Sequence, residues 1–289
     1  MTPAGDDTSS ISACLVVHNE EKLIERCLAS LDGVVDEIVL VHDGPCADRT
    51  LEIARSHGAR TFVQPRAGHG ERWRVLAYEQ ARGDWILRVD ADMYLSPELR
   101  QGLPQLVTRS DVNGYAFILP IWNGTRALTT AGPYHTALFR RERAHLLGMI
   151  QEPERVDPPV ERVPLVLEHR PAYDNYSWRT MLSKWRRWAK VHADELLLPF
   201  DAIPKYNWTG SADWPPRRRL LTRLMPFALP PYMLLFFLRN LSMPATGSRW
   251  MDLKQAAGWT FYNAMVEWYV GTRKLRGSRA DPRRRRRLR

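Results

Sequence analysis

The sequence has few cysteines and no long apolar run. Its three cysteines, Cys14, Cys27 and Cys46, lack the spacing of a metal site or of a disulfide framework, which favours a reducing, cytoplasmic setting. Residues 1–10 are polar and acidic, without the apolar core of a secretory signal, and we expect them to be a disordered N-terminus. The longest apolar stretch, residues 225–238, is interrupted by three prolines and falls short of the roughly 18 residues that a spanning helix needs.

Composition and charge set broad limits. A chain of 289 residues with 44% hydrophobic residues can bury a large core and should fold independently. Its net charge of +10 indicates an acidic partner, which is nucleic acid, an anionic membrane surface or a phosphorylated substrate. The charge alone does not choose among these three.

Strand and helix patterns alternate through the first hundred residues. This alternation predicts a parallel, doubly wound sheet whose ligands bind at the carboxyl ends of the strands. Asn19 is expected to cap the helix that follows the first strand. The predicted strands are residues 11–17, 37–41, 61–63 and 85–89, and the predicted helices include residues 48–57, residues 71–80 and one that begins at Ser96-Pro97.

The pattern of the sequence changes after Gly114. Short strands over residues 115–120 and 137–140 indicate a mixed-sheet half that holds a second substrate. Residues 153–164 are rich in proline and charge, which predicts an extended loop. A further strand over residues 163–167 would place His169 at its end.

An acidic pair follows the strand at residues 85–89. Because side chains on a strand alternate, Asp90 and Asp92 should project to one side just past its end. Two carboxylates at one point suit Mg²⁺ or Mn²⁺, although such pairs also cap loops. After the first strand the chain reads His18-Asn19-Glu20-Glu21 and has no basic, glycine-rich phosphate loop, which argues against a nucleotidyltransferase.

The second half is rich in tryptophan and arginine. A helical pattern over residues 177–198 has Trp, Met and Ala on one face and Arg and Lys over much of the rest. This pattern fits either a solvated helix packed on the core or a helix at a membrane interface. Residues 225–238, near basic clusters, fit a helical hairpin resting in a bilayer surface, with a buried core hairpin as the rival.

We therefore treat residues 176–276 as one basic, aromatic helical region that associates with a membrane, ending in a helix over residues 249–276. Residues 277–289 are an Arg-rich tail that we expect to be disordered. The tail could touch phospholipid or nucleic acid, or only solvate the chain.

Three segments of the first hundred residues carry a resemblance. They are residues 15–21 (LVVHNEE), 37–44 (EIVLVHDG) and 81–92 (ARGDWILRVDAD). In this order they resemble inverting family 2 glycosyltransferases with a GT-A fold, and within that family the bacterial branch of lipopolysaccharide-core glucosyl- and heptosyltransferases. The resemblance implies a GT-A domain over residues 11–175: a Rossmann-like mixed sheet with helices on both faces, a nucleotide-binding half (11–100) and an acceptor half (101–175).

The resemblance also implies roles for matching residues. Asp43 would hydrogen-bond the base of the donor, and Val75 stands where the family usually has Asn after the residue matched by Arg74. Asp90 and Asp92 would hold Mg²⁺ or Mn²⁺ on the donor diphosphate, with His169 as a metal ligand or a diphosphate contact; a structural histidine is the alternative. The implied nucleotide-sugar contacts are His18, Asn19, Glu20, Asp43, Arg74 and Asp90.

A base for the acceptor hydroxyl comes from the same resemblance. Members of this branch carry the pattern Gly-x-x-His-Glu. The matching residues 148–152 of this chain are GMIQE, so the Glu is kept and the His is replaced by Gln. Inversion needs a carboxylate that removes the hydroxyl proton while a cation neutralises the leaving diphosphate. Glu152 is the expected base, with a solvated loop acid as the alternative.

Together these features predict a metal-dependent glycosyltransferase, peripheral on the cytoplasmic face of the cell membrane, that glycosylates a lipid-linked or cell-envelope glycan. UDP-sugars are the expected donors by analogy. Clustering of Arg with Trp and Phe, rather than along a groove, favours a membrane over nucleic acid as the acidic partner. A transferase with a soluble acceptor and a non-catalytic basic binding module are the alternatives.

Overall fold

A computed structural model describes residues 9–174, 177–208, 229–242 and 248–275. One eight-stranded sheet carries the fold, in the order β3-β2-β1-β4-β7-β6-β10-β5. Its strands are β1 (Ile11–Val17), β2 (Glu37–Asp43), β3 (Arg60–Gln64), β4 (Trp85–Arg88), β5 (Met93–Leu95), β6 (Gly114–Ile118), β7 (Tyr134–Arg140) and β10 (Val160–His169).

The first half of the sheet is parallel, as the sequence predicts. β1 pairs in parallel with β2 and with β4, and β2 pairs in parallel with β3. β4 is buried along its whole length, which explains why three of its four residues are apolar. From β7 onward the sheet is mixed, because β7 runs antiparallel to both β4 and β6. The expected Rossmann-like mixed sheet is therefore confirmed.

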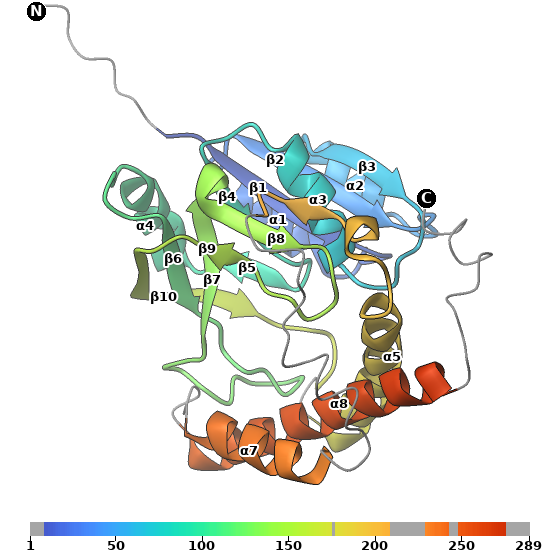
Figure 1. The fold of residues 1–289 in the computed structure, drawn as a ribbon. Helices are drawn as coiled ribbons and strands as arrows, with labels where there is room; N and C mark the ends of the chain where they lie inside the picture. Colours follow the sequence, from blue (N-terminus) through green and yellow to red (C-terminus); the bar gives the residue numbers. More distant parts are fainter. Residues whose placement is uncertain (1–8, 175–176, 209–228, 243–247, 276–289) are drawn as a thin grey trace, which may run out of the picture.

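Helices cover both faces of the sheet (Figure 1). Leu28 of α1 and Leu99 of α4 belong to the core cluster on one face, and Val75 and Tyr78 of α3 belong to the cluster on the other. Ser96 caps α4, as the sequence predicts, because its Oγ accepts a hydrogen bond from the Leu99 backbone amide. The helices of this part are α1 (Ile24–Leu31), α2 (Thr50–Ser56), α3 (Glu71–Gln80) and α4 (Pro97–Val107).

A second, small sheet lies beside α3. It contains β8 (Ala144–Leu147), β9 (Arg155–Val156) and β11 (Lys205–Tyr206), in the order β11-β8-β9. The predicted loop over residues 153–164 is thus only partly a loop, since it holds β9 and the first half of β10. Its prolines are tolerated because much of this segment is exposed.

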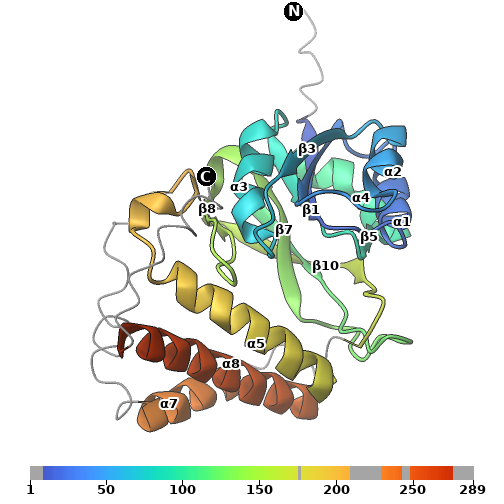
Figure 2. The ribbon, with the colours of Figure 1, turned by 90° about the vertical axis from the view of Figure 1, so that its right-hand side faces the viewer.

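Three helices form a separate layer on one side of the molecule (Figures 1 and 2). They are α5 (Trp178–Glu195), α7 (Leu229–Leu241) and α8 (Arg249–Leu275). Ala189 and Ala193 of α5 pack on Tyr262 and Val266 of α8, and α7 packs on α8. Gly258 permits the close approach of α5 and α8, because a Cβ there would meet the Trp185 ring at 2.1 Å.

The membrane predictions stay untested by this arrangement. Within the described ranges, no helix is both long enough and apolar enough to cross a bilayer. α7 is not a core hairpin, because Leu235 is 68% exposed and Leu234 is 59% exposed. Residues 1–8, the basic cluster at 217–219, Arg223, the start of the 225–238 stretch and the 277–289 tail lie outside the described residues.

Candidate active site

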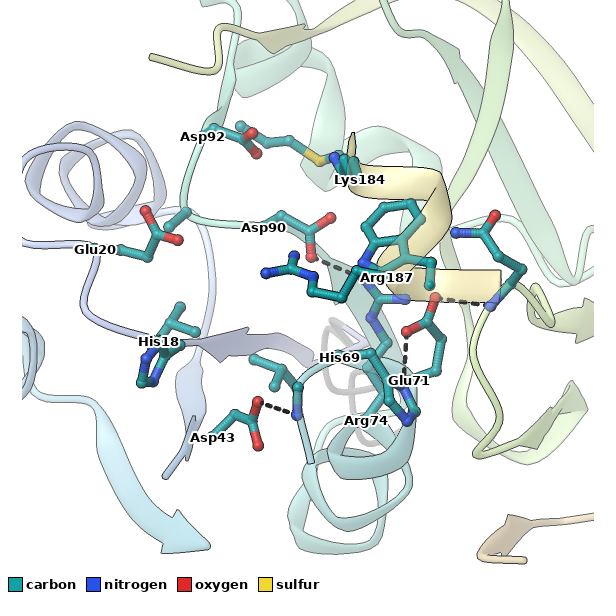
Figure 3. A pocket seen from close by; sticks show the side chains of 18 of the residues that line it. His18, Glu20, Asp43, His69, Glu71, Arg74, Asp90, Asp92, Lys184 and Arg187 are labelled. Carbon is teal, nitrogen blue, oxygen red and sulfur yellow. Dashed lines mark hydrogen bonds and ion pairs between the residues drawn. The ribbon is translucent and has the colours of Figure 1, made fainter. Parts of the chain in front are cut away.

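A pocket of about 560 Å³ opens where the parallel strands end. Figure 3 shows His18 and Glu20 after β1, Asp43 at the end of β2, and Asp90 and Asp92 after β4, all directed into it. The carboxyl ends of parallel strands meet at one edge of a sheet, which is why residues far apart in the sequence converge here. The pocket also receives Arg74 from α3 and His169 from β10, so seven of the predicted site residues line it: His18, Glu20, Asp43, Arg74, Asp90, Asp92 and His169.

Asp90 is tied to Arg74. The Arg74 Nη2 lies 2.9 Å from Asp90 Oδ1. Burial alone would raise the pKa of Asp90, but the nearby guanidinium groups of Arg74 and Arg88 outweigh it and hold this pKa well below its usual range. Asp90 is therefore a carboxylate at any physiological pH.

Asp92 lies beside His169, with His169 Nε2 3.4 Å from Asp92 Oδ2. Among the described residues, no three His, Cys, Asp or Glu side chains form a metal site by themselves. Mg²⁺ is commonly held by one or two carboxylates together with substrate phosphates and water. The donor set here, Asp92 with Asp90 beside it, fits a cation shared with a bound diphosphate and does not fit an all-protein cage.

Glu20 stands next to this acidic pair. Burial is the main cause that raises its pKa to about 7, and the charges of Asp92, Asp48 and Asp90 add to the effect. A cation placed among these carboxylates would favour the ionised form of Glu20. The negative charge concentrated at the strand ends therefore favours the binding of a cation or of groups that donate hydrogen bonds.

Asp43 organises the loop between β3 and α3. Its Oδ1 accepts from the Ala67 amide and from Trp73 Nε1 (3.0 Å), and its Oδ2 accepts from the Gly68 amide and Arg66 Nη1, both at 2.9 Å. The Asp43 side chain is 5% exposed. Asp43 therefore holds the shape of one pocket wall, and its contact with a base stays a prediction.

Asn19 does not cap the first helix, and that prediction is wrong. α1 begins at Ile24, with no side-chain cap. Asn19 adopts φ of 53°, and its Oδ1 accepts a hydrogen bond from the Ala47 amide, 28 residues away. The side chain thus ties the loop after β1 to the loop after β2, and it is not among the residues that line the pocket.

Glu152 follows a pocket-lining residue but does not line the pocket itself. Gln151, with φ of 63°, is among the lining residues, whereas Glu152 is half-buried and is not. The buried Met149 and Ile150 anchor this turn, and the Gly148 amide donates to the Pro204 carbonyl at 2.9 Å. The structure therefore brings the turn to the site without bringing the Glu152 carboxylate into the pocket.

Sequence reasoning missed a buried histidine between two glutamates. His69 Nδ1 lies 3.1 Å from Glu71 Oε2, and His69 Nε2 lies 2.7 Å from Glu195 Oε1. The other oxygens of these carboxylates accept from backbone amides, Glu71 from Gln151 (3.1 Å) and Glu195 from Ile150 (2.9 Å). The cluster joins α3, α5 and the 149–151 turn at one wall of the pocket.

Charge explains the state of this cluster. Burial opposes a charged imidazole, but hydrogen bonds to Glu195 and Glu71 outweigh burial and raise the pKa of His69 to about 9. Burial likewise opposes the charge of Glu71, and the hydrogen bond from His69 with the charge of Arg74 lowers its pKa to about 2. His69 is thus an imidazolium at neutral pH, donating through both nitrogens.

The far wall of the pocket comes from the C-terminal helices. α5 supplies Met181, Lys184, Trp185, Arg187 and Trp188, and α8 supplies Gln255 and Trp259. Trp185 and Trp259 stack with ring centroids 6.3 Å apart, and Lys184 Nζ lies 4.4 Å from the centre of the Trp188 ring. The tryptophan and basic stripes of α5 were visible in the sequence, but periodicity could not show that they face the strand ends.

Family comparison agrees with this architecture. Residues 12–156 match the model of the family described as glycosyl transferase family 2. The chain belongs to glycosyl transferase family 2. The family that residues 15–92 resemble is therefore confirmed, and the matched range ends just before β10 and the helical layer.

Curated relatives of this family 2 chain include an uncharacterized glycosyltransferase of Rickettsia bellii, 35% identical over 109 residues that cover 37% of this chain and 36% of the relative. The lipopolysaccharide core biosynthesis glycosyltransferase LpsC of Rhizobium meliloti is 32% identical over 106 residues, covering 35% and 38%. The matched region thus spans only about a third of the length of these relatives.

Two solved structures illustrate the range of structural likeness. S. aureus TarS 1–349 in complex with UDP matches with a TM-score of 0.45 and 13% identity, over 93% of this chain and 92% of that one. Mycobacterium tuberculosis glucosyl-3-phosphoglycerate synthase in complex with Mg²⁺ and UDP matches with a TM-score of 0.35 and 26% identity, over 46% and 57%.

Proposed function

We propose that this protein is a metal-dependent, inverting glycosyltransferase that moves a sugar from a nucleotide-sugar donor to a lipid-linked or cell-envelope glycan. The observation that carries the proposal is the pocket itself, where Asp90, Asp92 and His169 meet at the strand ends of a family 2 domain. We place the GT-A domain at residues 11–175, with α5 and α8 closing the pocket.

The donor side of the pocket is the strand edge. Its nucleoside would lie along the loop that Asn19 ties down, near His18 and Glu20, with the base toward Asp43. The loop shaped by Asp43 supplies Arg66 and the Gly68 backbone to the same wall. A UDP-sugar is the donor that we expect.

Mg²⁺ or Mn²⁺ would be held by Asp92, Asp90 and His169, and when bound it would neutralise negative charge on the departing diphosphate. Arg74 keeps Asp90 ionised and fixed in place through their 2.9 Å contact. The charge of Asp90 makes a cation favourable at this point without any change in its protonation.

Glu152 is the proposed base for the acceptor hydroxyl. The 149–151 turn that precedes it is held by Glu71 and Glu195 through the Gln151 and Ile150 amides. The Glu152 carboxylate, which does not line the pocket, would turn toward the acceptor hydroxyl when the acceptor binds, since catalytic contacts often tighten only in such complexes. The test is turnover: UDP release from a panel of UDP-sugars with Mn²⁺, with and without a bacterial lipid extract.

Acceptor-stimulated UDP release supports the proposal. Binding of nucleotide sugars without turnover on any lipid or soluble glycan would favour a non-catalytic module instead. Turnover on a water-soluble glycan alone would favour the alternative of a soluble acceptor.

Association with the cytoplasmic membrane face is the second part of the proposal. The α7–α8 surface carries apolar side chains next to basic residues such as Arg239 and Arg249, the pattern of an interfacial helix pair. The exposed apolar residues are Leu234 (59%), Leu235 (68%), Leu238 (51%), Trp250 (68%) and Trp268 (59%).

Vesicle flotation tests this surface. We expect the protein to float with phosphatidylglycerol-containing vesicles at low salt, and Leu235→Glu to weaken flotation. Val63→Glu is the matched control, since Val63 is 51% exposed on edge strand β3, away from α7. Protein that stays in the soluble fraction at low salt would contradict membrane association.

A further inference from the structure

The pocket has two walls of different chemistry. Its strand-end wall is rich in carboxylates, whereas the lining residues from the described parts of α5 and α8 include no acidic side chain. That second wall combines two cations, Lys184 and Arg187, with three indole rings, Trp185, Trp188 and Trp259. Figure 3 shows Lys184 and Arg187 entering from the side opposite His18 and Asp43.

The arginines of the strand-end wall already have acidic neighbours. Arg66 pairs with Asp43 at 2.9 Å, and Arg74 pairs with Asp90 at 2.9 Å. Below them, Arg88 lies 3.6 Å from the buried Glu154. Positive charge on this wall is thus largely balanced by carboxylates of the same wall.

The positive charge of the α5 wall comes from one helix and faces the carboxylates of the other wall. Burial lowers the pKa of Lys184, and the charges of Asp92 and Asp90 oppose this shift. Lys184 is half-buried, and its ammonium stands over the Trp188 ring at 4.4 Å from the ring centre. Arg187 lies one helical turn later on the same face, which places both cations over one stretch of the pocket. A cation held against an aromatic ring in a partly desolvated pocket is well placed to bind an anion strongly.

The indole rings complete the ligand chemistry. Trp185 and Trp259 stack on each other with an interplanar angle of 27°, so the two indoles brace each other and add aromatic surface to the pocket that both line. The C–H face of a pyranose ring packs on such a surface, while its hydroxyl groups remain available to polar neighbours such as Gln255. A sugar that carries an anionic group can pack on the indole rings and bind the two cations at the same time.

We propose that the α5 wall is an acceptor subsite that binds a sugar bearing a phosphate or carboxylate group, with Trp185 and Trp259 under the ring and with Lys184 and Arg187 on the anion. This inference rests on the proposed function, in which the donor occupies the strand-end wall. The donor diphosphate offers the same anionic chemistry, so the experiment must separate the two sources of negative charge.

The probes are glucose 6-phosphate, neutral glucose, and UDP with Mn²⁺. Affinities are measured by ligand-observed NMR for the sugars and by calorimetry for UDP. We expect glucose 6-phosphate to bind roughly 10-fold or more tightly than glucose, which is the effect of about one charge-assisted hydrogen bond. It should still bind when UDP and Mn²⁺ are saturating, because the two sites are separate.

The decisive variants are Lys184→Met, Arg187→Gln and the double variant that combines them. Arg186→Gln is the matched control. Arg186 is exposed on the same helix and does not line the pocket. We expect the double variant to lose the preference for glucose 6-phosphate over glucose and to keep UDP affinity within about twofold. Arg186→Gln should change neither.

Three results would overturn the inference: equal binding of glucose and glucose 6-phosphate, displacement of glucose 6-phosphate by UDP, or a parallel loss of UDP affinity in the double variant. The last two would assign the cations to the donor diphosphate. Absence of UDP binding to the wild-type protein would contradict the proposed function separately, and the two sugar arms would then decide the subsite alone.

Discussion

His69 Nε2 and Glu195 Oε1 lie 2.7 Å apart although 126 residues separate them in the sequence. This contact joins the last turn of α5 to the loop that begins α3, and it is buried. Through the second oxygen of Glu195, the contact also holds the Ile150 amide of the turn before Glu152. The helical layer is therefore fastened to the GT-A sheet at the pocket wall.

His69 makes stability depend on pH. Its pKa rises from the ordinary value of 6.5 to about 9 in the folded state, so the contribution is complete below pH 6.5 and is lost as pH rises to about 9. The shift corresponds to a free energy on the order of 3 kcal/mol. Urea unfolding from pH 6 to 10 should show the wild-type protein losing stability relative to His69→Gln in this window. Parallel curves for the two proteins would mean that His69 is not charged in the fold.

Gly258 sets the approach of α5 to α8. Because a Cβ there would meet the Trp185 ring at 2.1 Å, Gly258→Ala should destabilise the helical layer by about 1–3 kcal/mol. Gly271→Ala in the same helix is the control: nothing lies within 4 Å of its Cβ position, so we expect a gain of up to about 1 kcal/mol. Thermal unfolding of both variants measures the difference, and equal shifts would refute this packing.

Glu152 and Glu154 offer a matched pair of substitutions. Glu152→Gln should lower turnover by roughly 100-fold or more and leave UDP affinity unchanged, since only the proposed base is lost. Glu154→Gln should instead destabilise the fold by roughly 3 kcal/mol, because the Glu154 carboxylate is buried against Arg88 and accepts from Tyr78 Oη at 2.7 Å. Wild-type turnover in Glu152→Gln would remove Glu152 from the mechanism.

Asp43→Asn tests the loop between β3 and α3. Asn keeps only one acceptor oxygen, so it cannot accept from both the Gly68 and the Ala67 amides, and we expect a loss of about 1–3 kcal/mol in stability and weaker UDP binding. Asp111→Asn, at an exposed carboxylate, is the control and should change neither quantity. Unaltered UDP affinity in a folded Asp43→Asn protein would separate this loop from the donor site.

The sequence predicted the parallel half well, because its strands are buried and its helices amphipathic. The boundaries of β1 and α3 agree with the predicted ones, and the strand-end position of Asp43, Asp90 and Asp92 followed from topology alone. Short edge elements such as β5 and β9 were missed, since two or three residues carry no periodicity.

The rest of the site depends on contacts between distant segments. Local pattern showed that α5 has a tryptophan stripe, but not that Trp185 and Lys184 turn toward Asp92 in the same pocket. The His69–Glu195 contact was invisible for the same reason: single His and Glu residues give no pairing signal. The prediction that Asn19 caps a helix failed because an Asn that caps a helix and an Asn that links two loops have the same sequence context.

The most direct test of the account is calorimetric titration of UDP into the wild-type protein with and without Mn²⁺, beside Asp92→Ala. Asp92 lines the pocket beside His169 and is not part of the core. We predict binding that depends on Mn²⁺ and is lost in Asp92→Ala. UDP binding of equal strength with and without Mn²⁺, unchanged in the variant, or no binding of any nucleoside diphosphate, would contradict a metal-dependent donor site at these strand ends.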